Sequence, residues 1–165
     1  MRFEKVSFDQ YKNACIGCGR SIAGISDDIL RKEWEDIKLP VRATSGSAGY
    51  DFFMPYEIAV SCAPQSVPTG IRCQIDEGYV LICCPKSGLG CKYHMALDNT
   101  IGVIDADYYN SDNEGHIMLK FRTDVPITLS KGQKFAQGVF LPFGITDDDY
   151  ADGIRNGGFG STGST

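Results

Sequence analysis

The sequence predicts a single, mainly β domain, either a sandwich, a barrel or a jelly roll, on three observations. Its 165 residues suit one domain. From residue 40 onward, short apolar or alternating segments are separated by glycine, proline, asparagine and aspartate, a pattern typical of strands joined by turns. Only residues 26–37 show helical spacing, so helix is a minor part of the expected fold.

The predicted strands share apolar or alternating side chains bounded by turn residues. They are YDFFM (50–54), EIAV (57–60), GIRCQI (70–75), GYVLICC (78–84), GVIDADYY (102–109), HIMLKF (116–121) and KFAQGVFLPF (134–143). After Phe143 the apolar density falls, and the acidic, then glycine-rich sequence predicts a link into a flexible tail. We therefore expect one domain over residues 1–150 and a tail over 151–165.

The N-terminal part combines a strand with an inserted helix. RFEKVS (2–7) predicts a first strand, and residues 9–37 are interpreted as an insertion. Within it, Ser26 can cap a helix over residues 26–37, and acidic residues follow in the first turn. The apolar residues of this helix recur at helical intervals and are Ile29, Leu30, Trp34 and Ile37.

The charge excludes some kinds of partner. Sixteen basic and 21 acidic side chains give a net charge of -5, which argues against general affinity for nucleic acid or an anionic membrane. An anionic ligand must therefore meet a local group of cations. No apolar segment reaches the roughly 20 residues of a membrane span, and MRFEKVSFDQ is too charged for a secretory signal, so we expect a cytoplasmic protein.

The seven cysteines are expected to be free thiols, because an odd number in a reducing compartment does not suit a disulfide framework. Cys83 and Cys84, in YVLICC, are predicted to be small buried side chains. CIGC (15–18) offers half of the four ligands that zinc needs, and no second pair follows. We interpret it as loop cysteines without metal, although copies in an oligomer could share an ion.

PKSGLG (85–90) follows directly on an apolar strand. Lys86 supplies a cation, Ser87 a hydroxyl, and Gly88 permits close approach of backbone N–H groups, a combination that suits phosphate oxygens. A plain turn with a surface lysine is the alternative.

GVIDADYY places Asp105 and Asp107 two residues apart, so that on a strand they share one face. A carboxylate held there could act as a general base toward water, and a solvated hairpin edge is the alternative. The amide of Asn99 can both donate and accept hydrogen bonds, as one edge of a nucleobase requires.

Lys134 and Gln137 are three residues apart and point to opposite faces of a regular strand. We therefore expect one of them to lie at a bend or to be purely structural. SAGYD (47–51) is a tight turn that ends in Asp51, for which a structural role and a ligand role both stay open.

Five motifs occur in a fixed order: SAGYD, PKSGLG, GVIDADY, GQKFAQ and GGFGSTG. In order and in spacing they resemble the motifs of the trimeric dUTPase family, and the resemblance runs from Leu39 to Thr165. It implies a distorted jelly roll that forms a homotrimer with shared active sites. It also implies Mg²⁺-assisted hydrolysis of dUTP to dUMP and pyrophosphate, which limits uracil in DNA and supplies dUMP for dTMP synthesis.

The resemblance assigns a role to each matched residue. Asp105 corresponds to the base that activates the water attacking the α-phosphorus, and Tyr108 to the tyrosine that packs on the deoxyribose. Asn99 and the main chain at Gly102 and Met118 would bind uracil.

Other matched residues would meet the phosphates. The phosphate contacts would come from Lys86, Ser87, Gly88 and Gln137, and Asp51 would contact magnesium through water. Residues 151–165 would form a closing lid. Its ligand contacts would come from Arg155, Phe159, Gly160, Ser161 and Thr162.

Three features depart from the family. The family usually has arginine where Lys86 stands, and an ammonium cannot make a bidentate fork to phosphate. The short hairpin after Tyr108 is extended to YYNSDNEG, whose tip could reach the pocket or a neighbouring subunit. Arg155 lies one residue closer to Phe159 than is usual. Alternatives that stay open are a dCTP deaminase or dCTP-hydrolysing relative, and a phage-type dUTPase with an added regulatory protein partner.

Overall fold

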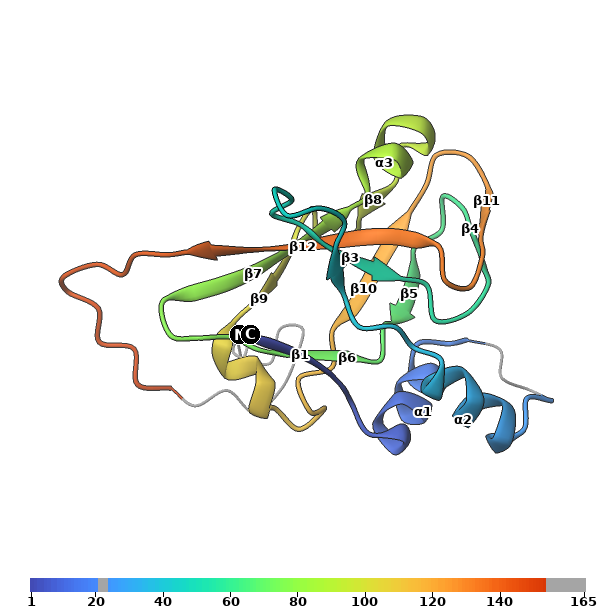
Figure 1. Cartoon of the computed structure of the whole chain (residues 1–165), viewed down its shortest axis with the longest axis horizontal. Coiled ribbons are helices and arrows are strands. Elements are labelled where there is room, and N and C mark those ends of the chain that lie inside the picture. Colours follow the sequence, from blue (N-terminus) through green and yellow to red (C-terminus); the bar gives the residue numbers. More distant parts are fainter. Residues whose placement is uncertain (21–23, 154–165) are drawn as a thin grey trace.

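Strands make up most of the regular structure in the computed structural model, which describes residues 1–20 and 24–153 (Figure 1). The strands are β1 Arg2–Lys5, β2 Val41–Arg42, β3 Tyr50–Phe53, β4 Ile58–Val60, β5 Gln65–Pro68, β6 Ile71–Gln74, β7 Tyr79–Pro85, β8 Ala96–Leu97, β9 Gly102–Ile104, β10 Met118–Arg122, β11 Ile127–Leu129 and β12 Lys134–Pro142. The helices are α1 Phe8–Gly17, α2 Asp27–Glu35, α3 Ser87–Tyr93 and the 3₁₀ helix η1 Ala106–Asn110. The predicted mainly β fold is confirmed.

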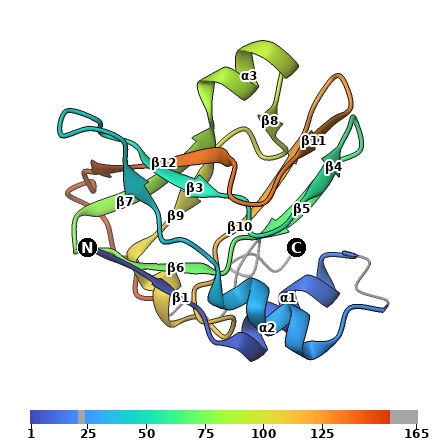
Figure 2. The same ribbon diagram turned by 45° about the vertical axis from the view of Figure 1, so that its right-hand side comes forward.

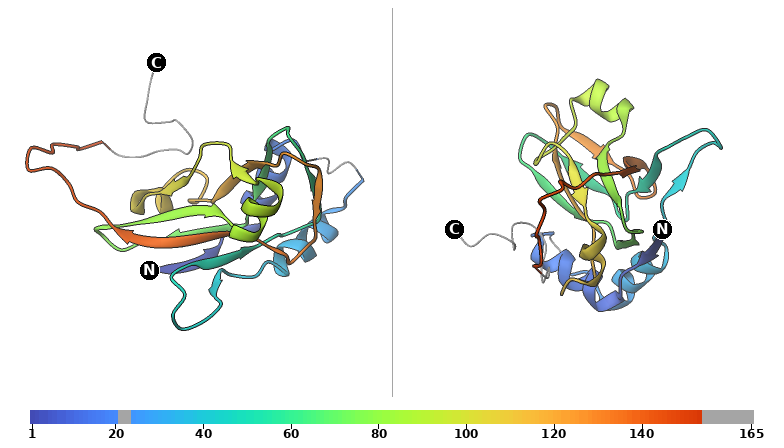
Figure 3. Two further views of the ribbon diagram at one scale, coloured as in Figure 1. Left: turned by 90° about the horizontal axis from the view of Figure 1, so that it is seen from above. Right: turned by 90° about the vertical axis from the view of Figure 1, so that its left-hand side faces the viewer.

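Antiparallel sheets surround the core. The largest has the strand order β2-β3-β12-β7-β9, the next has β5-β10-β8, and β1-β6 and β11-β4 form pairs. The helices α1 and α2 lie together at one end of the β body, and α3 lies at the other end (Figure 2). Beyond β12, residues 143–153 leave the body as an extended arm (Figure 3).

The pairing of β12 with β7 forms the centre of the largest sheet. Its register runs without interruption from Ala136 opposite Pro85 to Pro142 opposite Tyr79. Gly138 lies within this ladder, where an added Cβ would come 2.8 Å from Leu81 Cδ1 and 3.1 Å from a ring carbon of Phe52. A glycine is therefore needed there, because it lets these two core side chains pack against the strand.

The observed strands match the predicted segments, with one correction. GVIDADYY is a strand only to Ile104, and η1 then begins at Ala106. The strand β2 lies in LPVRATSGSAGYD, which resembles the opening strand and turn of the dUTPase family, whereas three other short strands, β5, β8 and β11, were not predicted. Each of the three has two to four residues, too few to show an alternation of their own.

The inserted segment holds two helices rather than one. Ser26 caps α2 as predicted, and its Oγ accepts from Ile29 N at 3.4 Å. Leu30 faces the core, but Ile29 is 58% exposed, so its assignment to the apolar face was wrong. The helix α1 was missed. Its N-cap is Ser7, whose Oγ accepts from Gln10 N at 3.1 Å.

A largely buried ion pair helps to join α1 and α2 to the β body. The Arg20 guanidinium donates to both oxygens of Glu33, at 2.6 and 2.8 Å, and stacks 3.5 Å above the ring of Tyr56. Tyr11 OH donates to Glu33 Oε1 at 2.5 Å. Burial raises the pKa of Tyr11, which therefore stays a neutral donor.

CIGC belongs to the last turn of α1, so its interpretation as a loop was wrong. Cys15 is buried on the helix, and Cys18 is the C-cap residue, with its Sγ 3.3 Å from Cys15 O. Burial raises the pKa of the Cys15 thiol. All seven cysteines are free; Cys83 is buried as predicted, whereas Cys84 is only half-buried. Within the described ranges, no helix is long and apolar enough to cross a membrane.

His116 gives the fold a dependence on pH. The imidazole is buried, its Nε2 accepts from Gly70 N at 2.8 Å, and burial lowers its pKa to about 4. Between pH 6.5 and 4 the unfolded chain therefore binds a proton that the folded chain does not, so stability falls as the pH falls. His116 should account for a loss of about 2 kcal/mol between pH 7 and pH 5.

Urea unfolding of the wild type and His116→Gln at pH 7 and pH 5, at one protein concentration, measures this loss. The variant should lose much less stability than the wild type over this interval. His94→Gln is the matched control, because the side chain of the other histidine is 70% exposed. Equal pH dependence in the wild type and His116→Gln would contradict the prediction.

Candidate active site

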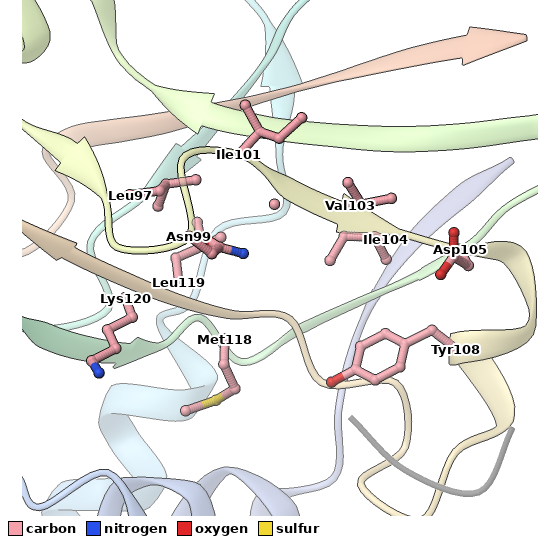
Figure 4. A pocket seen from close by; sticks show the side chains of 11 residues that line it. Leu97, Asn99, Ile101, Val103, Ile104, Asp105, Tyr108, Met118, Leu119 and Lys120 are labelled. Atoms are coloured by element: carbon pink, nitrogen blue, oxygen red, sulfur yellow. The ribbon is translucent and has the colours of Figure 1, made fainter. Parts of the chain in front are cut away.

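A cavity of about 290 Å³ opens between β9 and β10 (Figure 4). Five of the residues singled out in the sequence meet here, although they come from different segments of the chain. The lining residues are Leu97, Asn99, Ile101, Gly102, Val103, Ile104, Asp105, Tyr108, Met118, Leu119 and Lys120. The mixture of apolar walls with a few polar groups is typical of a small-molecule site.

A tight turn presents Asn99 to the cavity. Ile101 N donates to Asn99 O at 2.8 Å, and Thr100 adopts a left-handed φ of 72°. Asp98 N donates to Lys120 O at 2.8 Å, which ties the turn to β10. The turn thus fixes an amide at one end of the cavity. Gly102 follows, where an added Cβ would lie 3.1 Å from Cys83 Cβ, a tight contact that β9 and β7 avoid because this residue has no side chain.

Asp105 lies at the other end of the cavity, close to Tyr108 (Figure 4). It is the N-cap residue of η1, because β9 has already ended at Ile104. The expectation that Asp105 and Asp107 share one face of a strand was therefore wrong. Asp105 is half-buried and lines the cavity, whereas Asp107 is exposed and is not among the lining residues.

The Tyr108 ring forms part of the cavity wall and is 5% exposed. Its hydroxyl donates to His116 O at 2.8 Å and accepts from Asn113 Nδ2 at 2.7 Å. Both partners lie after η1, so the hairpin that follows the tyrosine holds the phenol. Sequence reasoning missed Asn113; the added polar residues in YYNSDNEG were the signal that could have found it.

A second group of predicted residues gathers around Asp51. The carboxylate is buried, Lys86 Nζ donates to Oδ1 at 2.7 Å, and Lys134 Nζ lies 2.7 Å from Oδ2. Lys86 is the N-cap residue of α3, so PKSGLG opens a short helix that begins at Ser87 rather than forming a plain turn. The first N–H groups of such a helix have no partner within it and can meet an anion.

Gln137 joins this group through the sheet register, which places it opposite Asp51 on β3 and Cys84 on β7. A register shift between Lys134 and Ala136 provides the expected bend, so that Lys134 and Gln137 both lie near Asp51. Gly49 makes room for the amide, because an added Cβ would come 2.8 Å from Gln137 Oε1.

The site residues thus form two groups within one chain. None of Asp51, Lys86 and Gln137 lines the cavity that contains Asp105. The remaining predicted site residues lie outside the described part of the chain. They are Arg155, Phe159, Gly160, Ser161 and Thr162.

The charge state of Asp51 follows from its surroundings. Burial opposes the charged form, but the two lysine ammoniums outweigh it, and the pKa of Asp51 is lowered. Both carboxylate oxygens are therefore engaged by cations. In residues 1–20 and 24–153 there is also no group of three or more His, Cys, Asp or Glu side chains that could hold a metal ion. This arrangement favours the structural role that the sequence had left open for Asp51.

The comparisons with known proteins agree with this geometry. A family model described as dUTPase matches residues 35–163. A deoxyuridine 5'-triphosphate nucleotidohydrolase of Lactococcus lactis is 41% identical over 140 residues, which cover 78% of this chain and 89% of the relative. The protein of that name from Shewanella sp. strain MR-7 is 36% identical over 140 residues with the same coverage.

Solved structures give the same result. The dUTPase from Streptococcus mutans has a TM-score of 0.60 at 39% identity, covering 66% of this chain and 88% of that chain. The dUTPase from phage phi11 of S. aureus has a TM-score of 0.59 at 21% identity, covering 73% of this chain and 93% of that chain. The second likeness supports the fold alone.

Asp51→Asn should destabilise the fold by about 1–3 kcal/mol, because the neutral amide cannot balance two ammoniums that face a buried site. Urea unfolding measures the loss. Asp98→Asn is the matched control: Asp98 also pairs with two cations, Lys120 at 3.1 Å and Arg122 at 2.9 Å, but on an exposed surface. A loss for Asp51→Asn no larger than that of the control would contradict the prediction.

Proposed function

The chain belongs to the dUTPase family, and from this membership we propose how its residues hydrolyse dUTP to dUMP and pyrophosphate. The observation that carries the proposal is the cavity in which Asn99, Gly102, Asp105, Tyr108 and Met118 meet. It offers hydrogen-bonding groups at one end, a carboxylate at the other, and an aromatic ring beside the carboxylate (Figure 4).

Asp105 is proposed as the general base. Its carboxylate would accept a proton from the water that attacks the α-phosphorus, and a base positioned in this way typically contributes about 10²–10⁴-fold in rate. The half-buried position at the start of η1 supports this role, because the turn holds the side chain at the cavity wall.

The nucleoside is proposed to fill the cavity. The Asn99 amide and the main chain at Gly102 and Met118 would hydrogen-bond the uracil edge, since an amide supplies both a donor and an acceptor. The Tyr108 ring would pack on the deoxyribose and leave no room for a ribose 2′-hydroxyl. Its burial and its two hydrogen bonds support a fixed wall at this point.

The phosphates are proposed to meet Lys86, Ser87, Gly88 and Gln137. These residues lie away from the cavity of their own chain, so a complete site would combine the cavity of one subunit with the phosphate loop of another. The proposed assembly is a homotrimer. Val103 on β9 and Ile101 just before it are exposed apolar side chains, at 51% and 45%, which supports an interface there.

Mg²⁺ is the proposed cofactor, and the described residues do not fit a protein-held ion. Both oxygens of Asp51 face lysines, and among residues 1–20 and 24–153 no three His, Cys, Asp or Glu side chains cluster to hold a metal ion. We therefore propose that the ion arrives on the triphosphate oxygens, where it would reduce the repulsion between a polyanion and a protein of net charge -5.

Residues 151–165 are proposed as a lid over a domain formed by residues 1–150. Phe159 would stack on uracil and Arg155 would meet the phosphates. Gly160, Ser161 and Thr162 would add backbone and hydroxyl donors. Closure would exclude water and strengthen the electrostatic contacts. A cytoplasmic location is proposed with this function, because nucleotide triphosphates are made and used there.

The substrate assignment is tested by incubating the full chain with Mg²⁺ and each of dUTP, dCTP, dTTP and UTP, following pyrophosphate and ammonia. Pyrophosphate from dUTP, with little from the other nucleotides, is the expected result. Release of ammonia from dCTP, or turnover of dTTP equal to that of dUTP, would contradict the substrate assignment.

Asp105→Asn should lower kcat for dUTP about 10²–10⁴-fold with little change in nucleotide affinity, because the amide keeps the shape of the side chain but cannot take the proton. Steady-state pyrophosphate release and calorimetric binding of a non-hydrolysable dUTP analogue measure the two effects. Asp112→Asn is the control, an exposed acid in the hairpin that follows. A variant at Asp105 with wild-type kcat would refute the assignment.

A further inference from the structure

The hairpin extension over residues 109–115 folds back beneath Tyr108. Asn113 Nδ2 donates to Tyr108 OH at 2.7 Å, and Asn113 Oδ1 accepts from Gly115 N at 3.2 Å. Because a backbone N–H can only donate, the amide atom that faces Gly115 must be the oxygen. The amide nitrogen therefore faces the phenol.

The Tyr108 hydroxyl also makes a hydrogen bond to the backbone just after the extension. It donates its single hydrogen to His116 O at 2.8 Å. The hydroxyl is thus held by one donor and one acceptor that arrive from different residues. Such a pair fixes the position of the oxygen and the direction of its hydrogen, and so restrains the outer end of the ring.

The extension is itself anchored, so Asn113 does not move freely. Glu114 accepts from Ser7 N at 2.7 Å and from Ser7 Oγ at 2.5 Å, at the start of α1. Tyr109 OH donates to Glu4 Oε2 at 2.6 Å, and the Arg72 guanidinium lies 3.6 Å above the Tyr109 ring.

The backbone conformation of the extension depends on a glycine. Gly115 has a left-handed φ of 68°, and an added Cβ would lie 2.7 Å from Tyr109 Cα and 2.8 Å from Tyr108 O. Only glycine allows the chain to pass so close beneath the tyrosine. The tip therefore lies against its own N-terminal segment, which is where the enlarged hairpin goes in the described chain.

From this arrangement we propose that Asn113 is a positioning residue that holds the Tyr108 ring and thereby sets the discrimination between deoxyribose and ribose. The inference rests on the proposed function, in which Tyr108 packs on the sugar. An apolar wall discriminates against a substrate with an added hydroxyl only if the wall is rigid. This discrimination between the two substrates reaches about 10²-fold. A ring released from Asn113 can yield to a 2′-hydroxyl.

The test compares kcat/KM for dUTP and for UTP in the wild type and in Asn113→Ala. The ratio of the two values should fall about 3- to 10-fold in the variant, the factor expected for one lost hydrogen bond. Tyr108→Phe removes this contact and also the hydrogen bond to His116 O, so its ratio should fall at least as far. The double variant should show no further fall below Tyr108→Phe, because Asn113 acts on the ring through the lost hydroxyl.

Asn110→Ala is the matched control, an exposed asparagine of the same hairpin, and its ratio should equal that of the wild type. If Asn113→Ala lowers both kcat/KM values by one factor, or changes neither, the proposal is overturned. Calorimetric affinities for dUMP and UMP give the same comparison without turnover. Failure of the wild type to hydrolyse dUTP would instead count against the proposed function.

Discussion

The pairing of β12 with β7 is the constraint on which the rest of the site depends. β12 also pairs with β3, and β7 also pairs with β9, so one strand pair sets the positions of Asp51, Gln137 and Gly102. β7 ends at Pro85, directly before the N-cap of α3, and β9 ends one residue before Asp105. A shift of the register of β12 by one residue would turn Gln137 to the opposite face of the sheet.

Glycine residues allow strands and side chains to pack closely in this sheet. Gly138 makes room for Leu81 and Phe52, and Gly102 lets β9 lie against Cys83. Gly49 makes room for the amide of Gln137. In each case a methyl group would come unusually close to a side chain that belongs to the core or to the site. Gly49 and Gly102, which belong to the motifs, therefore serve packing.

The long strands could be predicted because the alternation or apolar content of each strand is visible within a short stretch of sequence. Sequence reasoning missed α1, although Phe8, Tyr11 and Cys15 have helical spacing, because Cys15 also begins the CIGC motif, which suggested a loop. Motif order brought Asn99, Asp105 and Tyr108 to attention, and the structure places them around one cavity. Pairings over long sequence distances, such as Asp51 with Lys86 and Lys134, leave no local pattern.

The N-terminal segment contributes to the same arrangement. The two helices of the insertion are linked at Glu33, which accepts from Arg20 and from Tyr11, and Ser7, which precedes the insertion, holds the hairpin through Glu114. The chain of contacts then runs from Glu114 through the backbone to Asn113 and on to the phenol of Tyr108. Successive residues in this chain of contacts are joined by a hydrogen bond or are neighbours in the sequence. The backbone beneath the ring has no space for a side chain at Gly115. The extension is therefore held near its start through Tyr109 and Glu4 and near its end through Glu114 and Ser7, so the first N-terminal residues, which lie outside the dUTPase motifs, bear on the wall of the cavity.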